Sequence, residues 1–113
     1  MTFVYKILTV EEWNAFEESG SFEGSVNDKK DGFIHLTFEH QYPAILEKFF
    51  KGINEVVLVE IDSRLLEKDT LKIEANKPGG EKYPHLYSIL YMKAVTSHRE
   101  LSLPEEPRAA FQI

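Results

Sequence analysis

Hydrophobic residues recur at every second position in several short segments, a spacing typical of β-strands. Residues 2–9, TFVYKILT, are apolar on both faces and predict a central strand. Residues 55–62, EVVLVEID, are rich in branched side chains and predict another buried strand. Residues 71–76 alternate with Leu71, Ile73 and Ala75 on the inward side, which predicts a half-exposed strand. Two further strands are predicted at residues 85–90 and 92–101, after a turn at KPGGEKYP.

The segment FIHLTF at residues 33–38 places an imidazole in an apolar strand. Ile34, Leu36 and Phe38 share one face, which we expect to pack on the core, so His35 and Thr37 share the other. In one interpretation these two residues line a pocket. In the alternative, His35 is a partly buried residue whose ring bonds a backbone carbonyl.

Helical spacing begins directly after the first strand. Thr9 and Glu12 form a capping-box pattern, because the hydroxyl and the carboxylate can satisfy free amides at a helix start. Trp13 and Phe16 lie on one side of the helix that follows, and Gly20 ends it.

A second helix is predicted to begin at Tyr42 or Pro43 and to end at Gly52.

Between the two helices, the polar residues 21–32 predict a surface loop long enough to cover a site. The elements together predict an α+β fold with a small mixed or antiparallel sheet and two main helices. We expect one domain at residues 1–103 and a tail at residues 104–113. The core-facing positions predicted for the second helix are Ile45, Leu46, Phe49 and Phe50.

Composition narrows the choice of partners. The 113 residues, 42% of them hydrophobic, have the length of one ordinary domain. The net charge of −6 repels nucleic-acid phosphates and anionic lipids, so we expect neither nucleic acid nor membrane as a partner. No cysteine is present for disulfides or thiolate zinc sites. No N-terminal run suits a signal peptide or a membrane span, so we expect a cytoplasmic protein.

Common catalytic motifs are absent from the chain, including a glycine-rich phosphate loop, a nucleophile elbow and a paired-histidine zinc helix. The four histidines lack the spacing of metal ligands, so we expect no metal. Lys6 lies between Val4 and Leu8 on an apolar face, where an unpaired ammonium is costly. It therefore needs a carboxylate, a ligand anion or a route to solvent at a strand edge.

Later in the chain, Tyr83, His85 and Tyr87 share one side of a strand. Two phenols beside an imidazole suit a flat ring with hydrogen-bonding edges, although they also make an ordinary amphipathic strand surface. Two carboxylates compete for a catalytic role. Glu60 lies near the end of a buried strand, and Glu74 is solvated unless its face of the sheet borders a cleft.

The blocks VYKILT, EEW, DGFIHLTFEHQ, LVEID and IEANKPGGEKYPHLY follow one another in the chain. Over residues 3–101 the sequence resembles the uncharacterised family called domain of unknown function 952. That family usually has Phe-Ile-His-Leu-Ser-Thr with a glutamine three residues on; here Thr37 and Phe38 replace the serine and the threonine, and Gln41 matches. Ser88 stands where the family commonly has glycine, and Lys6 where many relatives have histidine.

The resemblance implies a compact relative of the ADP-ribosyltransferase fold, in which a split sheet holds NAD in a central cleft. On this basis Glu74 and His85 are the predicted catalytic residues and NAD the predicted cofactor. Glu74 would stabilise the oxocarbenium charge that develops when a ribosyl bond breaks, while histidine and hydroxyl groups orient the sugar. The ligand-binding residues predicted in the same way are Lys6, His35, Thr37, Gln41 and Tyr87.

Three functions stay open at this point. The first is a small enzyme that acts on NAD or an ADP-ribosyl compound. The second is a noncatalytic module that binds a nucleotide-like small molecule in the same cleft. The third is a protein-interaction domain, for which the acidic composition is the only sign. The sequence carries no signal for the oligomeric state.

Overall fold

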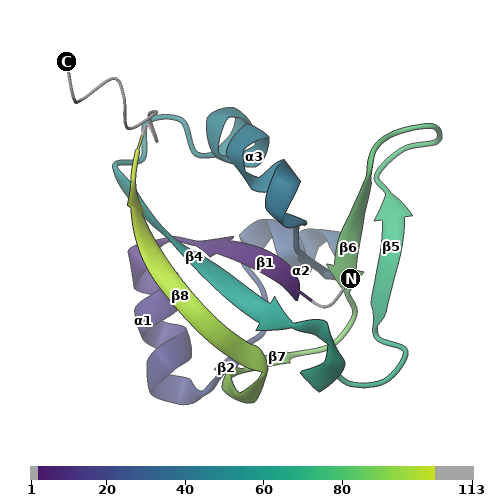
Figure 1. Ribbon diagram of the computed structural model, residues 1–113, viewed down its shortest axis with the longest axis horizontal. Helices are drawn as coiled ribbons and strands as arrows, with labels where there is room; N and C mark the ends of the chain where they lie inside the picture. The colour runs from purple at the N-terminus through teal and green to yellow at the C-terminus, as the bar shows by residue number, and fades with distance from the viewer. Residues whose placement is uncertain (1–2, 104–113) are drawn as a thin grey trace.

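The apolar run at residues 55–62 forms the long middle strand of the fold (Figure 1). In the computed structural model, which describes residues 3–103, this strand is β4 (Glu55–Asp62). β1 (Phe3–Leu8) pairs with one side of it and β8 (Val95–Ser102) with the other, both antiparallel. The prediction that the first strand is central is therefore wrong, because β4 takes that position.

Two smaller sheets complete the strand topology. One has the order β3-β6-β5 and contains β3 (Ile34–His35), β6 (Lys82–Leu86) and β5 (Leu71–Ala75). The other pairs β2 (Ser21–Phe22) with β7 (Leu90–Tyr91). The strand pairings in these two sheets are also antiparallel. An α+β fold with split antiparallel sheets is thus confirmed.

Helix α1 (Val10–Ser19) begins as predicted. The Thr9 hydroxyl accepts the Glu12 amide at 3.1 Å, and the Glu12 carboxylate accepts the Thr9 amide at 2.9 Å. α3 (Tyr42–Phe49) starts at the predicted residue, with proline in its first turn where no amide hydrogen is needed. It ends before the predicted Gly52. Three short 3-10 helices are η1 (Glu39–Gln41), η2 (Ser63–Leu65) and η3 (Met92–Ala94).

Residues 21–32 are not the surface loop predicted from their polarity. They contain β2 and a third helix, α2 (Val26–Asp31). Ser25 and Asp28 form a second capping box, in which the Ser25 hydroxyl accepts the Asp28 amide and the Asp28 carboxylate accepts the Ser25 amide. The polarity of these residues does not indicate a loop, because a short helix can be stabilised by its cap and by a buried ion pair instead of an apolar stripe.

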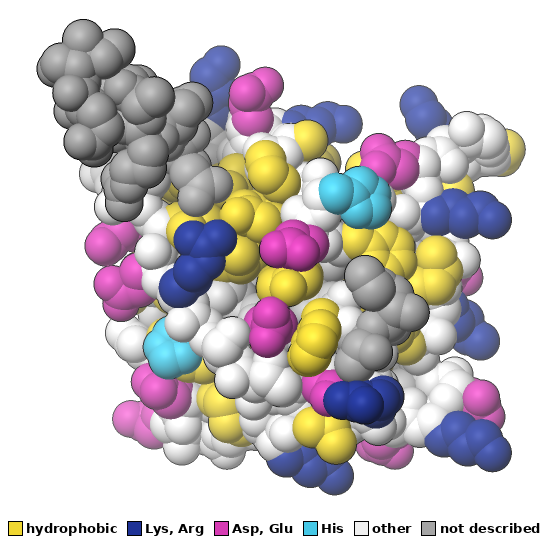
Figure 2. Space-filling model, viewed as in Figure 1, with side chains coloured by type: hydrophobic (Ala, Val, Ile, Leu, Met, Phe, Trp, Pro, Cys, Tyr) yellow, Lys and Arg dark blue, Asp and Glu magenta, His cyan; other side chains and the backbone are white. Residues whose placement is uncertain are grey.

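The β1-β4-β8 sheet has a core on each face. α1 packs Trp13 and Phe16 against one face, in a cluster that also holds Ile34, Leu36 and Leu86. α3 covers the other face, and hydrophobic side chains gather beside it in Figure 2. The buried members of this second cluster are Tyr5, Ile7, Leu46, Val56, Leu58 and Leu101.

Two apolar side chains lie where the sequence pattern did not place them. Phe49 on α3 is 65% exposed, so the predicted core stripe of this helix is wrong at that position. Only Leu46 of the stripe is fully buried, and Ile45 and Phe50 are partly buried against it. Ile73 on β5 is also exposed, so the inward face predicted for that strand is wrong at this position, although Leu71 packs against the first cluster.

The strands predicted at residues 33–38 and 92–101 are shorter than expected. Regular pairing of β3 covers only Ile34 and His35, and Thr37 forms a single bridge to Tyr5. That bridge has two backbone bonds of 2.8 and 2.9 Å and links β1 to the segment after β3. The last strand begins at Val95 because η3 occupies the residues before it. The predicted single domain at 1–103 remains a prediction, and the tail at 104–113 lies outside the described residues.

Candidate functional site

A cleft of about 1000 Å³ lies where β1, β3, β5 and β6 meet α2 and α3. Its volume is at the upper end of the range for small-molecule sites, roughly 300–1,000 Å³. The structure brings six of the seven predicted site residues together on its wall. These are Lys6, His35, Thr37, Glu74, His85 and Tyr87.

The seventh residue, Gln41, is buried behind the cleft and does not line it. Its side-chain amide donates to the Glu81 carboxylate and to the Lys82 carbonyl, both at 2.9 Å. Its carbonyl oxygen accepts the Phe38 amide at 3.0 Å and the Thr37 hydroxyl at 3.3 Å. Gln41 therefore joins the Thr37 segment to the start of β6 and positions a cleft residue without reaching a ligand itself.

Asp28 on α2 organises one wall of the cleft, although sequence reasoning did not single it out. The side chain is 2% exposed and lies 2.9 Å from the ammonium of Lys6. Lys6 also donates to the His35 carbonyl at 3.0 Å. Of the three partners considered for Lys6, the structure thus provides a carboxylate.

His35 is bound to Asp28 through both its backbone and its ring. The backbone amide donates to Asp28 Oδ1 at 3.1 Å, and ring Nδ1 lies 2.6 Å from the same oxygen. Ring Nε2 lies 2.9 Å from Asp31 Oδ2. Both nitrogens can donate at once only when each carries a proton. A hydrogen bond from His35 to a ligand therefore requires release of Nε2 by Asp31, whose side chain is about half exposed.

These contacts keep Asp28 ionised. Burial raises the pKa of the Asp28 carboxyl, but the hydrogen bond from His35 and the charge of Lys6 outweigh it. The pKa is therefore held well below its usual range.

Gly24, next to the cap, has a φ of +125°, and a Cβ added there would lie 2.9 Å from the Asp28 Cβ. The close approach of this loop to α2 thus requires glycine.

Glu74 and His85 form a second polar group beside the first, because β3 and β6 pair His35 with His85 and the two rings lie 5.9 Å apart. One Glu74 oxygen accepts the Tyr87 hydroxyl at 2.6 Å and lies 2.9 Å from His85 Nδ1. The hydrogen bonds from Tyr87 and His85 lower the pKa of Glu74 below its usual value. Glu74 therefore borders the cleft as a carboxylate held in place by two hydrogen bonds. The sequence leaves a catalytic role for Glu74 in this case, in which its face of the sheet borders a cleft.

An aromatic wall surrounds the His85 ring. Phe33 stacks on the imidazole with ring centroids 4.0 Å apart, and Tyr87 lies 5.3 Å from Phe33. His85 is 2% exposed, and its Nε2 is buried without a hydrogen-bond partner among residues 3–103. Nδ1 is already next to Glu74. In this arrangement His85 orients the carboxylate, and its other nitrogen is not open to solvent.

Glu60, the competing carboxylate, lies outside the cleft. It accepts hydrogen bonds from Tyr5 at 2.9 Å and from Thr96 at 2.6 Å. Burial and the bond to Glu60 raise the pKa of Tyr5 to about 12. Because Glu60 is on β4, away from the His85 wall, Glu74 is the carboxylate that fits the predicted role.

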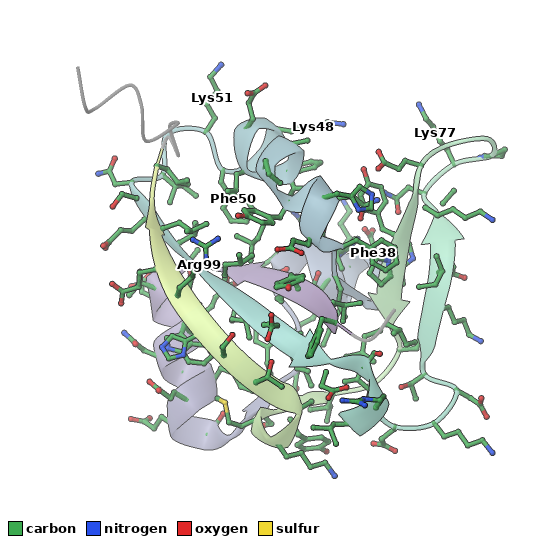
Figure 3. All side chains as sticks on the ribbon, in the orientation of Figure 1. Phe38, Lys48, Phe50, Lys51, Lys77 and Arg99 are labelled. Carbon is green, nitrogen blue, oxygen red and sulfur yellow. The ribbon has the colours of Figure 1, made fainter. Side chains whose placement is uncertain are left out.

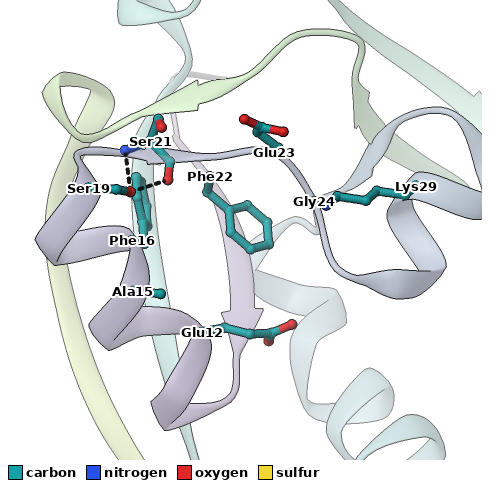
Figure 4. A pocket seen from close by; sticks show the side chains of 9 residues that line it. All are labelled: Glu12, Ala15, Phe16, Ser19, Ser21, Phe22, Glu23, Gly24 and Lys29. Carbon is teal, nitrogen blue, oxygen red and sulfur yellow. Dashed lines mark hydrogen bonds between the residues drawn. The ribbon is translucent and has the colours of Figure 1, made fainter.

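A smaller pocket of about 350 Å³ lies between α1 and the segment at residues 21–29 (Figure 4). Phe16 and Phe22 form its floor, and Ser19 and Ser21 bond each other at its edge. No residue predicted for a site lines it.

Residues 3–103 contain no group of three or more histidine, aspartate or glutamate side chains placed to hold a metal ion. No helix in the same range is long and apolar enough to cross a membrane.

The Asp28 network had one detectable sign in the sequence. Ser25 and Asp28 have the spacing of a capping box, and Gly32 follows where such a helix would end. This spacing predicts the helix but not the partners of the Asp28 side chain, because Lys6 and His35 are 22 and 7 residues away from Asp28 in the sequence.

Residues 7–98 match the family model described as protein of unknown function (DUF952). The chain belongs to this family. Three solved structures match it over nearly the whole length. The crystal structure of protein CC0527 from Caulobacter crescentus is 37% identical with a TM-score of 0.81, covering 98% of this chain and 97% of that one. A double mutant of CC0527 has 36% identity and the same TM-score and coverage.

The solution NMR structure of CC0527 is also 37% identical, with a TM-score of 0.78, and covers 100% of this chain and 97% of that one. No curated protein matches this DUF952 chain. The family predicted from the sequence blocks is thus confirmed, together with its α+β fold. The relation to ADP-ribosyltransferases stays a prediction.

Proposed function

We propose that the cleft binds a ribosyl compound with a cationic nitrogen ring, such as NAD, and breaks the bond between that ring and the ribose. The observation that carries the proposal is the Glu74 carboxylate, held by Tyr87 and His85 on the cleft wall. The same hydrogen bonds lower its pKa further below neutral pH, so the charged form is the one that faces the cleft. A fixed negative charge beside an aromatic wall favours a flat cationic ring over a neutral one.

The proposed reaction moves one electron pair. The bond between the ribose anomeric carbon and the ring nitrogen breaks, and its electrons remain on the nitrogen, so that nicotinamide leaves as a neutral molecule. Positive charge develops on the ribose, where Glu74 stabilises it. Water or an acceptor hydroxyl then forms the new bond to this carbon and releases its proton to solvent. Here Glu74 is the catalytic residue, and His85 and Tyr87 position it.

The remaining predicted ligand residues divide into those that line the cleft and Lys6, which acts through another residue. Thr37 and the partly exposed His35 line the same cleft as Glu74, and His35 pairs with His85 on β6. Lys6 acts through Asp28, because its ammonium is fully engaged by Asp28 and the His35 carbonyl. Lys6 therefore positions His35 and does not bind an anion.

A noncatalytic module that binds a nucleotide-like ligand is the second candidate. The contacts of the ring nitrogens of His35 and His85 favour this candidate. Both nitrogens of His35 have carboxylate partners, and Nε2 of His85 is buried. Neither ring presents a free nitrogen to solvent for proton transfer, which binding alone does not need.

Nicotinamide release from NAD tests the first function. We expect the purified protein to release nicotinamide, measured by chromatography, and Glu74→Gln to lower the rate on the order of 10²-fold. Glu100→Gln is the matched control, because Glu100 is an exposed glutamate on β8 outside the cleft, and its rate should equal that of the wild type.

Thermal shift separates the two candidates. A ligand present at 100 times its dissociation constant should stabilise the fold by about 2.7 kcal/mol. If NAD or ADP-ribose stabilises the fold but no nicotinamide is released, with or without added acceptors, the protein is a noncatalytic binding module and the proposed enzymatic function is wrong. No stabilisation by either compound would contradict both and favour the protein-interaction domain.

A further inference from the structure

The end of α3 forms a wall of the cleft that the proposed chemistry does not use. Lys48 and Phe49 lie there, together with Phe50, and all three line the cleft. Phe49 is 65% exposed, although it lies on a helix that packs its other face against the sheet. A single exposed phenyl ring is common, but this one borders a cavity large enough for a second ring of a ligand.

Charge is distributed unevenly around the cleft. Asp28, Asp31 and Glu74 are on the walls formed by α2 and β5, and the charge of Lys6 is neutralised by Asp28. Lys48 is a cleft lysine without an ion pair to any described residue. Positive charge is thus available on the α3 wall, whereas Asp31 and Glu74 supply negative charge from α2 and β5.

The ammonium of Lys48 and the ring of Phe49 act as one unit. Lys48 Nζ lies 5.2 Å from the centroid of the Phe49 ring, within the range of a cation–π contact. Figure 3 shows Lys48 on the side of α3 toward the β5–β6 hairpin, whereas Lys51 lies beyond the end of the helix and does not line the cleft. A cation next to an exposed aromatic ring suits a phosphate joined to a flat base, because the ammonium binds the phosphate charge and the phenyl ring stacks on the base.

We infer that Lys48 binds the diphosphate, and Phe49 the second base, of a dinucleotide whose cationic ring lies at Glu74. This inference rests on the proposed function and adds to it the half of the substrate that does not react. The charges of the ligand then match those of the cleft: its cationic ring meets the Glu74 carboxylate, and its phosphates meet the Lys48 ammonium. The two residues select a dinucleotide over a mononucleoside with the same reacting bond.

Binding of two ligands, measured by isothermal titration calorimetry, tests the inference. NAD has both halves, and nicotinamide riboside has only the reacting half. Lys48→Gln and Phe49→Ala should each weaken NAD binding about tenfold and leave nicotinamide riboside binding within about twofold. The controls are Lys51→Gln and Ile53→Ala, which change an exposed cation and a partly exposed apolar side chain beyond the end of α3, outside the cleft.

The outcomes separate the inference from the proposed function. Unchanged NAD affinity in both α3 variants, with wild-type binding of both ligands, would overturn the inference and leave the proposed function intact. Equal losses for NAD and nicotinamide riboside would also overturn it, because the residues would then shape the whole cleft. If the wild type binds neither ligand, the proposed function and the inference fall together. Urea denaturation of each variant checks that the fold is retained.

Discussion

Replacing Asp28 by asparagine tests whether a buried ion pair holds the cleft wall. The substitution keeps the shape of the side chain but removes its charge, and it leaves the Lys6 ammonium, in a residue 6% exposed, without a counter-charge. Breaking a buried pair by removing one partner costs about 3–5 kcal/mol. A single domain is usually stable by only about 5–15 kcal/mol, so the free energy of unfolding should fall by a large fraction.

Urea denaturation followed by tryptophan fluorescence measures this loss. Trp13 is the only tryptophan of the chain; it is buried and stacks on His98 with centroids 4.4 Å apart, so unfolding changes its surroundings. Asp31→Asn is the matched control, because Asp31 also contacts His35 but is about half exposed. Its cost should stay within about 1 kcal/mol.

The same pair predicts a pH dependence. The pKa of Asp28 is lower in the folded than in the unfolded chain, so its contribution is fully present above the unfolded value of about 3.9. The contribution is lost as pH falls through the lower, folded value. The difference between wild type and Asp28→Asn should therefore shrink when the melts are repeated at decreasing acid pH. A variant within about 1 kcal/mol of the wild type at pH 7 would refute the reasoning, since the Lys6 charge would then be solvated.

Three further predictions concern packing, capping and electrostatics. Phe16→Ala should destabilise by about 3–5 kcal/mol and Phe49→Ala by far less, because their exposures are 1% and 65%; equal denaturation midpoints would contradict this. Ser25→Ala should cost about 1 kcal/mol in the same assay, because it removes the side-chain cap of α2. Tyr87→Phe should raise the pKa of Glu74 toward its ordinary value, measured by NMR titration, and an unchanged pKa would show that the hydroxyl does not bond the carboxylate.

Local spacing determined the parts of this fold whose partners are near in sequence. The cap of α1 was predictable because Thr9 and Glu12 are three residues apart and satisfy each other's amides. The faces of residues 33–38 were predictable because side chains alternate along an extended chain whether or not it pairs. This placed His35 and Thr37 together on the cleft side, even though regular pairing of β3 covers only two residues.

Tertiary structure alone decided the partners and exposure of the remaining site residues. Asp28 meets Lys6 only because the bridge between Tyr5 and Thr37 brings β1 next to the segment that follows α2. Glu74 belongs to the cleft because the pairing of β5 with β6 places it beside His85 and Tyr87. The alternation of side chains along one strand cannot show which residues of another strand will lie beside it.

Phe49 gives the opposite case. Its spacing predicts a core position, but α3 covers only one face of the sheet and contacts it through Leu46, so the ring at the helix end stays exposed. Hydrophobic periodicity reports which residues share a side of an element. Burial depends in addition on how much of that side the neighbouring element reaches, and this is set by the crossing of elements that are distant in sequence.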